Sequence, residues 1–263
     1  PDVVKNADGS YDVNGNVSRC NAQVTVEDVT SPTAICQNIT VQLDPSGIVS
    51  ITPAQVNNGS TDNCGIAMMT VIPDIFTCAN IGANTVTFEV TDINGNVSTC
   101  TATVTVQDVT PPTAVCQNIT IALDAMGNAS ITPAQVNNVS TDACGISSMT
   151  VLPNSFSCAN VGANTVTLTV TDASGNSSSC NAIVTVQDVT PPAAVCQNIT
   201  VQLDAQGTAT ITAAQINNGS TEVCGIDTMT VSPNTFTCAN LGNNIVVLTV
   251  TDVNGNVSTC SAV

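Results

Sequence analysis

The sequence contains few of the side chains on which most enzymes and nucleic-acid-binding proteins depend. Its 263 residues include no His, no Trp, one Tyr and only two basic residues, Lys5 and Arg19. Without His, neither a Ser-His-Asp set nor a Cys-His set can be assembled for nucleophilic catalysis. With two basic residues, the chain cannot neutralise nucleic-acid phosphates. We therefore expect a protein that is not an enzyme and that has no nucleic-acid partner.

Long apolar runs and aromatic residues are also scarce. No uninterrupted apolar stretch reaches the length of about 18 residues that a membrane-spanning helix needs, so no membrane insertion is predicted for this segment. Nineteen acidic residues give a net charge of −17, which opposes binding to an anionic membrane surface. Hydrophobic residues make up 43% but aromatic residues only 2%, so Val, Ile and Thr must fill the core. That composition is typical of β-strands.

A period of 80 residues organises the chain. The decamer TDINGNVSTC at 91–100 recurs in closely similar form at 11–20, 171–180 and 251–260. Such a fixed period indicates tandem structural repeats. The predicted domains are the C-terminal part of a preceding repeat at 1–30, full repeats at 31–110 and 111–190, and a repeat at 191–263 that is truncated in its last strand.

Within one period, short alternating segments are separated by turn residues. The predicted strands include 38–43, 48–54, 66–73, 85–92 and 97–108. In 38–43 the apolar and polar residues alternate as in a half-buried strand. Asn94-Gly95 between two such strands predicts a hairpin turn, and 51–56 could form one short helical turn. Six or seven strands in 80 residues predict an all-β fold of tandem immunoglobulin-like β-sandwich domains.

The linkers between the repeats are short and contain paired prolines, as in QDVTPPTAVC at 107–116 and QDVTPPAAVC at 187–196. Proline fixes φ and removes a backbone donor, which ends a strand ladder. A short Pro-rich linker is semi-rigid. We therefore expect the domains to form an end-to-end rod.

Thirteen cysteines are the strongest compositional signal. Twelve form three sets of four, and Cys20 precedes Cys100 by one period. There is no His and no CxxC pair, which argues against zinc. Regularly placed cysteines indicate disulfides in an oxidising, extracellular compartment.

Several motifs occur in one order in each repeat. A DVTPP linker is followed by a Cys, by NITVQLD, by an STDNCG loop, by F-x-C-x-N-x-G-x-N and by TDxxGNxSxC. In this order they resemble the hyalin repeat (HYR), an extracellular immunoglobulin-like module. Many hyalin repeats have Pro after the first Cys, where this chain has Gln37, Gln117 and Gln197. The near-identical tandem also resembles the giant cell-surface adhesins of gliding bacteria.

That resemblance implies structural spacer repeats of a secreted adhesin on the bacterial outer cell surface, used for surface attachment or gliding motility. The implied partners are neighbouring repeats of the same long chain and an unidentified extracellular surface or glycan. Two alternatives stay open. The repeats could themselves bind polysaccharide or surfaces, or the chain could be a self-assembling extracellular filament subunit.

The disulfide pairing is predicted from the topology of this fold. The first and last strands of an immunoglobulin-like domain are parallel neighbours that start at the same end, so the first and fourth Cys of each set should pair, which leaves the second and third to pair with each other. The predicted pairs are Cys36–Cys100, Cys64–Cys78, Cys116–Cys180, Cys144–Cys158, Cys196–Cys260 and Cys224–Cys238.

Acidic residues recur near each junction between repeats, in a chain with almost no cations to pair with them. Three carboxylates from a linker, a loop and a turn could bind a hard cation such as Ca²⁺. The two predicted sets are Asp108, Asp142 and Asp172, and Asp188, Glu222 and Asp252. The alternative is that each is a turn residue that caps its own backbone. The spacing of Asp92, Asn94 and Asn96 does not fit an EF-hand, because Val97 stands where that loop needs Gly. No other cofactor is expected.

Overall fold

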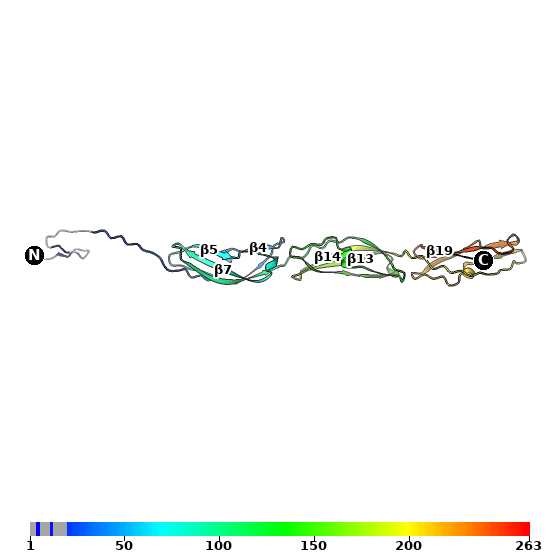
Figure 1. Cartoon of the computed structure of the whole chain (residues 1–263), viewed down its shortest axis with the longest axis horizontal. Coiled ribbons are helices and arrows are strands. Elements are labelled where there is room, and N and C mark those ends of the chain that lie inside the picture. Colours follow the sequence, from blue (N-terminus) through cyan, green and yellow to red (C-terminus); the bar gives the residue numbers. More distant parts are fainter. Residues whose placement is uncertain (1–3, 6–10, 13–19) are drawn as a thin grey trace. The chain divides into compact units, whose positions relative to one another are not determined.

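The computed structural model describes residues 4–5, 11–12 and 20–263 (Figure 1). Strands β1 (Val4–Lys5) and β2 (Tyr11–Asp12) form a short antiparallel pair. Half of the preceding repeat predicted at 1–30 lies outside the described residues. From residue 31 onward, "first", "second" and "third" repeat denote the three 80-residue periods.

The second repeat shows the architecture completely. Its larger sheet has the strand order β11-β13-β14-β9, and its smaller sheet pairs β10 with β12. The elements are β9 (Ile119–Ala122), β10 (Asn128–Ser130), α2 (Pro133–Val136), β11 (Ile146–Leu152), β12 (Ser155–Ser157), the 3-10 helix η2 (Cys158–Asn160), β13 (Gly162–Asp172) and β14 (Ser177–Gln187). The first strand β9 pairs in parallel with the last strand β14, while β13 pairs antiparallel with β14 and β11.

The first repeat has the same order of elements, with a β3-β8-β7-β5 sheet and a β4-β6 pair. These elements are β3 (Ile39–Gln42), β4 (Ile48–Ser50), α1 (Pro53–Val56), β5 (Ile66–Ile72), β6 (Ile75–Thr77), η1 (Cys78–Asn80), β7 (Gly82–Asp92) and β8 (Val97–Gln107). The single helical turn that 51–56 could form is present as α1. Thr52 and Gln55 form a capping box around its first turn.

The third repeat has a smaller main sheet. Its order is β16-β18-β19, beside a β15-β17 pair. Its elements are β15 (Thr208–Thr210), α3 (Ala213–Ile216), β16 (Ile226–Ser232), β17 (Thr235–Thr237), η3 (Cys238–Asn240), β18 (Val246–Asp252) and β19 (Val257–Ala262). Residues 199–202, which correspond to β9, form no strand here.

The cores are filled by aliphatic residues, as the low aromatic content predicts. In the second repeat, Val166, Leu168 and Val170 of β13 are fully buried against Val184 of β14 and Phe156 of the small sheet. Polar residues alternate with these on the outer face of β13. Burial of every second residue on long strands is the pattern of a half-covered sheet. The predicted class, tandem immunoglobulin-like β-sandwiches, is confirmed.

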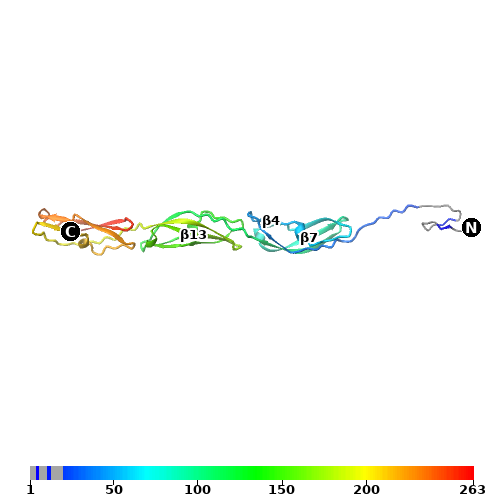
Figure 2. The same cartoon turned by 180° about the vertical axis from the view of Figure 1, so that it is seen from behind.

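The compact units of the structure do not coincide with the 80-residue periods of the sequence. One compact unit comprises Pro1–Val41, Val49–Phe76 and Gly82–Val106, and the other comprises Gln42–Ile48, Thr77–Ile81 and Gln107–Val263. Two segments from the first period, around Gly47 and Cys78, therefore belong to the unit that contains the second and third repeats. The domain boundaries at 30, 110 and 190 stay a prediction, as does the rod. Figure 2 shows the same elements from behind.

Candidate functional sites at the junctions of repeats

Each repeat contains one internal disulfide, formed by the first and fourth Cys of its set. The bonds are Cys36–Cys100, Cys116–Cys180 and Cys196–Cys260, with Cα atoms 6.2, 5.8 and 5.8 Å apart. In the second repeat, Cys116 lies just before β9 and Cys180 lies on β14, the strand that pairs in parallel with β9. The parallel pairing places both cysteines at the same end of the sheet, which is the reasoning from which these pairs were predicted.

The other predicted pairs, Cys64–Cys78, Cys144–Cys158 and Cys224–Cys238, are wrong. Cys78 is bonded to Cys144 instead, and Cys158 to Cys224, with Cα atoms 5.1 and 5.2 Å apart. Cys20, Cys64 and Cys238 are free and exposed. These two bonds join consecutive repeats, each across a separation of 66 residues.

The reason lies in the strand between the two cysteines. Cys144 and Cys158 flank β11, whose seven residues span about 23 Å at about 3.3 Å per residue. A disulfide needs Cα atoms within about 7 Å. This strand is expected from the sequence, and its length alone rules out a bond between the two cysteines that flank it. Cys144 lies at the end of the sandwich that receives the preceding linker, here called the proximal end, and Cys158 lies at the opposite, distal end.

The inter-repeat disulfides pack tightly against glycine turns. Gly127 has a φ of +74°, and a Cβ built there would lie 2.7 Å from Cys158 Sγ and 2.8 Å from Val223 Cγ1. Gly47 meets Cys78 Sγ at 2.7 Å and Ala143 Cβ at 3.3 Å in the same way. Both the backbone conformation and the lack of space require glycine at this position. The recurrence at two junctions indicates a specific contact between repeats.

The TDxxGN turn holds the linker that enters the same repeat. In the third repeat, Asn256 Nδ2 donates to the Asp188 carbonyl at 3.1 Å, and Asn254 Nδ2 donates to Asp188 Oδ2 at 2.8 Å. Ser258 Oγ donates to the Pro192 carbonyl at 2.6 Å. These bonds fix a linker whose prolines offer no backbone donors, so the linker is attached along its length to the sandwich that it enters.

The buried aspartate of this turn caps its own backbone. Asp252 is 1% exposed, and its Oδ1 accepts from the backbone N–H groups of Asn254 and Asn256 while Oδ2 accepts from Asn256 Nδ2. Burial on its own would raise the pKa of Asp252, but these hydrogen bonds and one from Gly255 outweigh burial and lower it. Asp92 has the same arrangement and a lowered pKa for the same reasons. The hairpin interpretation of TDINGN is therefore confirmed.

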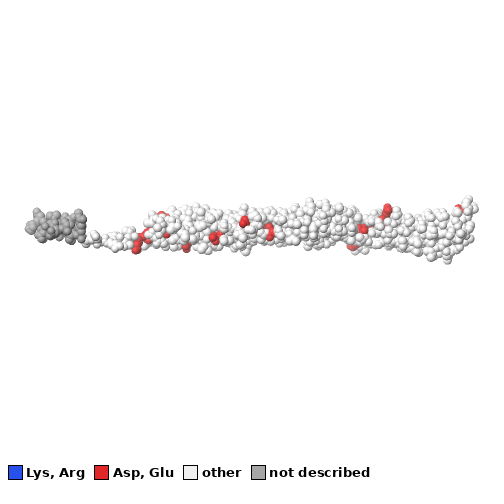
Figure 3. Space-filling model, turned by 90° about the horizontal axis from the view of Figure 1, so that it is seen from above, with Lys and Arg blue, Asp and Glu red and all other residues white. Residues whose placement is uncertain are grey.

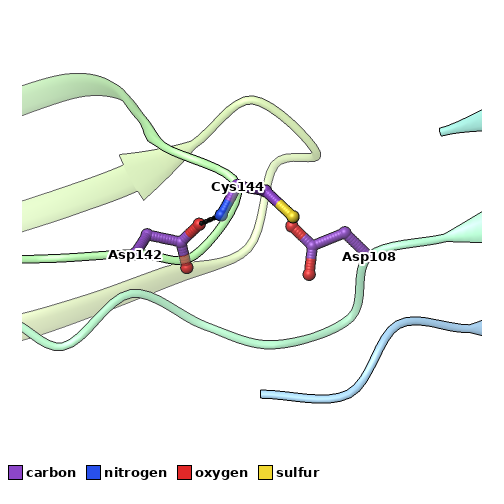
Figure 4. A group of neighbouring side chains, drawn as sticks. All are labelled: Asp108, Asp142 and Cys144. Carbon is purple, nitrogen blue, oxygen red and sulfur yellow. Dashed lines mark hydrogen bonds between the residues drawn. The ribbon is translucent and has the colours of Figure 1, made fainter. Parts of the chain in front are cut away.

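The predicted calcium ligands come together only in part. Asp108 of the linker and Asp142 of the loop before β11 lie close to Cys144, with their ligand atoms within 4.8 Å of one another (Figure 4). Asp142 Oδ1 accepts from the backbone N–H of Cys144 at 2.8 Å. Cys144 is in a disulfide, so its sulfur is not a thiolate ligand. Two carboxylates remain at this position.

Asp172, the third predicted member of that set, is engaged elsewhere. Its Oδ1 accepts from the backbone of Ser174 and Asn176, and its Oδ2 accepts from Asn176 Nδ2. In the other predicted set, Glu222 Oε1 accepts from the backbone N–H of Val223, and Asp188 and Asp252 make the turn and linker bonds described above. The structure does not bring the ligand atoms of Asp188, Glu222 and Asp252 into one group.

A group of three carboxylates does occur where the chain enters the first repeat, at positions outside the two predicted sets. Ligand atoms of Asp28, Asp62 and Asp92 lie within 4.8 Å of one another. Cys64 is beside them, and its interaction with Asp28, followed by desolvation, raises the pKa of the Cys64 thiol. Apart from that interaction, the buried Oδ2 atoms of Asp28 and Asp62 have no hydrogen-bond partner. The sequence signal that could have identified this group is the recurrence of acidic residues at the same positions of every period.

Elsewhere on the face shown in Figure 3, acidic side chains form separate spots and not one continuous patch. Among the described residues, no helix combines the length and the hydropathy needed to cross a bilayer.

The geometry defines a class of protein: disulfide-bonded tandem immunoglobulin-like repeats. Residues 107–186 match the family model of the HYR domain, so the chain contains an HYR domain. Hyalin of Strongylocentrotus purpuratus is 29% identical over 225 residues, which is 80% of this chain and 18% of that protein. Hyalin of Lytechinus variegatus is 28% identical over 232 residues, 81% of this chain and 42% of that protein. The chain thus spans less than half the length of either relative.

The solved structures that match include titin domains I67–I69, in an E-to-A variant. That match has a TM-score of 0.33 and 12% identity and covers 89% of this chain and 98% of the titin chain. Cadherin domains 1–4 of protocadherin gamma B7 match with a TM-score of 0.33 and 10% identity over 88% of this chain and 76% of that chain. The sequence matches and the disulfide-rich β-sandwich together indicate extracellular, adhesion-type repeats.

Proposed function

We propose that these repeats are the structural spacer of a secreted bacterial cell-surface adhesin, which carries a binding region away from the cell for surface attachment or gliding. The observation that supports this most directly is the placement of the disulfides relative to the linkers. A spacer must transmit load without lengthening, and the covalent connections of this chain meet that requirement.

The internal disulfide shortens the path that a pulling force can follow through a repeat. Force that reaches Cys116 passes through the bond to Cys180 and leaves by the next linker toward Cys196. The 63 residues between Cys116 and Cys180 (180 − 116 − 1) cannot be drawn out while that bond is intact. Only the 16 residues from Cys180 to Cys196 (196 − 180) can be drawn out. Fully extended, they reach about 55 Å, against about 275 Å for 80 unconstrained residues.

The inter-repeat disulfide adds a second covalent connection across the same junction. Cys158–Cys224 runs in parallel with the linker at 187–196, so a load is shared between two connections. Neighbouring repeats then stay attached even when the hydrogen bonds between linker and turn open. A ligand-binding domain needs no such arrangement, whereas a spacer under tension benefits from it.

Force spectroscopy on single molecules tests this proposal. The chain is held between tags at its two ends and pulled with and without reductant. Without reductant, the two complete repeats should give no unfolding step that releases more than the short unprotected segment. With reductant, each should release about 80 residues of length. Long unfolding steps in the oxidised chain would show that the disulfides do not carry the load.

A binding assay separates the spacer from the alternative in which the repeats bind polysaccharide themselves. The same chain is passed over a polysaccharide array and over glass and plastic surfaces, with bovine albumin as the reference for passive adsorption. The spacer function predicts no binding above that reference. Labelling of intact cells of the source organism with an antibody against the repeats tests the outer-surface location.

A further inference from the structure

Four Asn-Gly dipeptides lie among the described residues. Glycine has no Cβ, so its backbone nitrogen can reach the side-chain amide carbon of the preceding asparagine with little hindrance. This attack forms a succinimide ring and is the ordinary route by which asparagine loses its side-chain amide in water. Two of the dipeptides follow the helices α1 and α3, and two lie in the TDxxGN turns. In that order they are Asn58-Gly59, Asn218-Gly219, Asn94-Gly95 and Asn254-Gly255.

The two dipeptides that follow the helices are open to this reaction. Asn218 and Gly219 are both exposed. Within the part of the chain that the structure describes, neither the Asn218 side chain nor the Gly219 N–H has a hydrogen-bond partner. A Cβ built on Gly219 would meet no atom within 4 Å, so the ring has room to form. Asn58 and Gly59 are exposed in the same way, with the same open space.

The two dipeptides in the TDxxGN turns are protected by hydrogen bonds. The Gly255 N–H donates to the Asp252 carbonyl at 3.2 Å, and the equivalent bond at Gly95 measures 3.3 Å. Asn254 Nδ2 also donates to Asp188 Oδ2 at 2.8 Å. These bonds must break before the glycine nitrogen can attack, which slows the reaction while the repeat is folded.

The second repeat has the same loop without the dipeptide. Asn138 is followed by Val139, whose φ of 61° lies in a region that glycine adopts easily and a β-branched residue rarely does. The Asn138 N–H donates to the Val115 carbonyl at 2.8 Å, as the Asn218 N–H does to the Val195 carbonyl at 2.9 Å. The two loops therefore share a backbone arrangement and differ in the residue that follows the asparagine.

This loop holds the segment by which the chain enters the sandwich. In the third repeat, the Val195 carbonyl accepts from the Asn218 N–H, and the Val195 N–H donates to Ser220 Oγ at 2.9 Å. The entry segment, 193–197 here and 33–37 in the first repeat, is thus attached to the loop that carries the dipeptide. The flanking bridges are Ala193–Thr221 and Cys196–Asn217 in the third repeat, and Thr33–Thr61 and Cys36–Asn57 in the first.

We propose that Asn58 and Asn218 are sites of spontaneous conversion to isoaspartate, and that this modification loosens the entry segments of the first and third repeats as the protein ages. The second repeat is spared. The reaction needs only water, so it proceeds in any extracellular fluid without an enzyme.

The steps balance without an oxidant or a reductant. The Gly219 nitrogen attacks Asn218 Cγ, the Cγ–Nδ2 bond breaks, and ammonia leaves with the proton of the Gly219 N–H. Water then opens the succinimide. Cleavage between Cγ and the ring nitrogen gives aspartate, and cleavage between the main-chain carbonyl carbon and that nitrogen gives isoaspartate.

Isoaspartate changes the length of the main chain in this loop. The chain then runs through Cβ and Cγ, which adds one carbon between Asn217 and Thr221. These two residues are four positions apart (221 − 217), and each forms a bridge to the entry segment. The added carbon shifts one bridge relative to the other, so the bonds between them should weaken. Ordinary aspartate leaves the main chain unchanged and should not have this effect.

Incubation of the folded chain at pH 8 and 37 °C tests the site. Samples are reduced and digested with pepsin at low pH, and mass spectrometry with electron-transfer fragmentation measures isoaspartate at each asparagine. The dipeptides after the helices should convert about tenfold faster or more than those in the turns, because hydrogen bonds protect the turns. In urea with reductant the four rates should become similar, since this protection is lost.

Val139→Gly is the matched control. It creates an Asn-Gly dipeptide in the loop of the second repeat and relieves the positive φ, so the variant should fold. Asn138 should then convert at the rate of Asn218, whereas in the parent it should stay unmodified over the same period.

Hydrogen exchange measures the loosening. In the aged chain, amides at 193–197 should exchange about tenfold faster or more than in the fresh chain, because the bonds to the loop are weakened. Asn218→Asp adds the same charge without the extra carbon and should exchange like the fresh chain.

Three outcomes would overturn the proposal. They are equal conversion after the helices and in the turns of the folded chain, no conversion of Asn138 in Val139→Gly, and equal exchange at 193–197 in aged and fresh chains. None of them would contradict the spacer function, because that function rests on the disulfides within the chain.

Discussion

Replacing both cysteines of the Cys158–Cys224 bond with Ser should selectively weaken the third repeat. When this repeat unfolds beside a folded neighbour, its chain stays fixed at two points, the end of β14 at Gln187 and the disulfide at Cys224. The closed segment is 37 residues long (224 − 187). In the chain-entropy model, closing a loop of that length stabilises the folded state by about 4 kcal/mol at 25 °C.

The estimate of about 4 kcal/mol uses the shorter loop because the second repeat stays folded and holds one end of it. The full separation of 66 residues between the two cysteines would apply only if both repeats unfolded. For a domain of this size, a loss of about 4 kcal/mol corresponds to a fall in midpoint temperature of roughly 15–30 °C. The second repeat should change less, because it keeps its Cys78–Cys144 bond to the first repeat, whereas the third repeat keeps no inter-repeat bond.

Urea denaturation followed by circular dichroism measures the effect. Every variant is built on Cys20→Ser, Cys64→Ser and Cys238→Ser, which removes the free thiols that could exchange. The expected result is a separate first transition in the double variant, absent from the parent. Coincident curves for parent and variant would refute the argument that the inter-repeat bond restricts the unfolded third repeat.

Three further predictions concern the acids and the free thiols. The hydrogen bonds that lower the pKa of the Asp252 carboxyl in the folded state stabilise the fold while this group is ionised. That stabilisation is present above the unfolded pKa and is lost as pH falls through the folded pKa, so the free energy of unfolding should fall below about pH 4. Asp252→Asn should flatten this pH dependence in urea titrations. Asp28→Asn should lower the pKa of Cys64 and speed its alkylation by iodoacetamide at pH 8, with the rate at Cys238 unchanged; equal rates at Cys64 would contradict the cause assigned to the shift. If the carboxylates in the first repeat bind calcium, excess calcium should raise the thermal midpoint of the chain, and Asp62→Asn should abolish the rise; identical melting curves in calcium and in chelator would exclude such binding.

The sequence predicts the interior of a repeat well because local patterns determine it. Alternation along 85–92 and 97–108 identifies the two long strands, and Asn94-Gly95 identifies the turn between them. The pairing of Cys116 with Cys180 follows from the parallel first and last strands of the predicted fold. These inferences depend only on residues that are close in sequence or on one topological rule.

The contacts between repeats could not be predicted by the same reasoning, because it treated each period as a closed unit. Under that assumption Cys144 had to pair with Cys158, although the strand between them holds the two apart. Asp172 was placed in a cation site for a different reason, the recurrence of acids near each junction, whereas the N–H groups of its own turn occupy its oxygens. Local backbone donors were nearer to that carboxylate than any ligand from another repeat.

The two kinds of disulfide compensate for different weaknesses of this composition. With 2% aromatic residues, each small aliphatic core buries little surface, so a repeat depends on crosslinks for stability. The internal bond restricts the unfolded chain of its own repeat. The inter-repeat bond restricts the unfolded chain of the adjacent repeat. When one repeat unfolds, it stays attached at two points to its folded neighbour, so it has fewer conformations to sample before it refolds. A chain that combines both bonds keeps its connectivity when single repeats open, and this property suits an extracellular spacer that is repeatedly loaded and released.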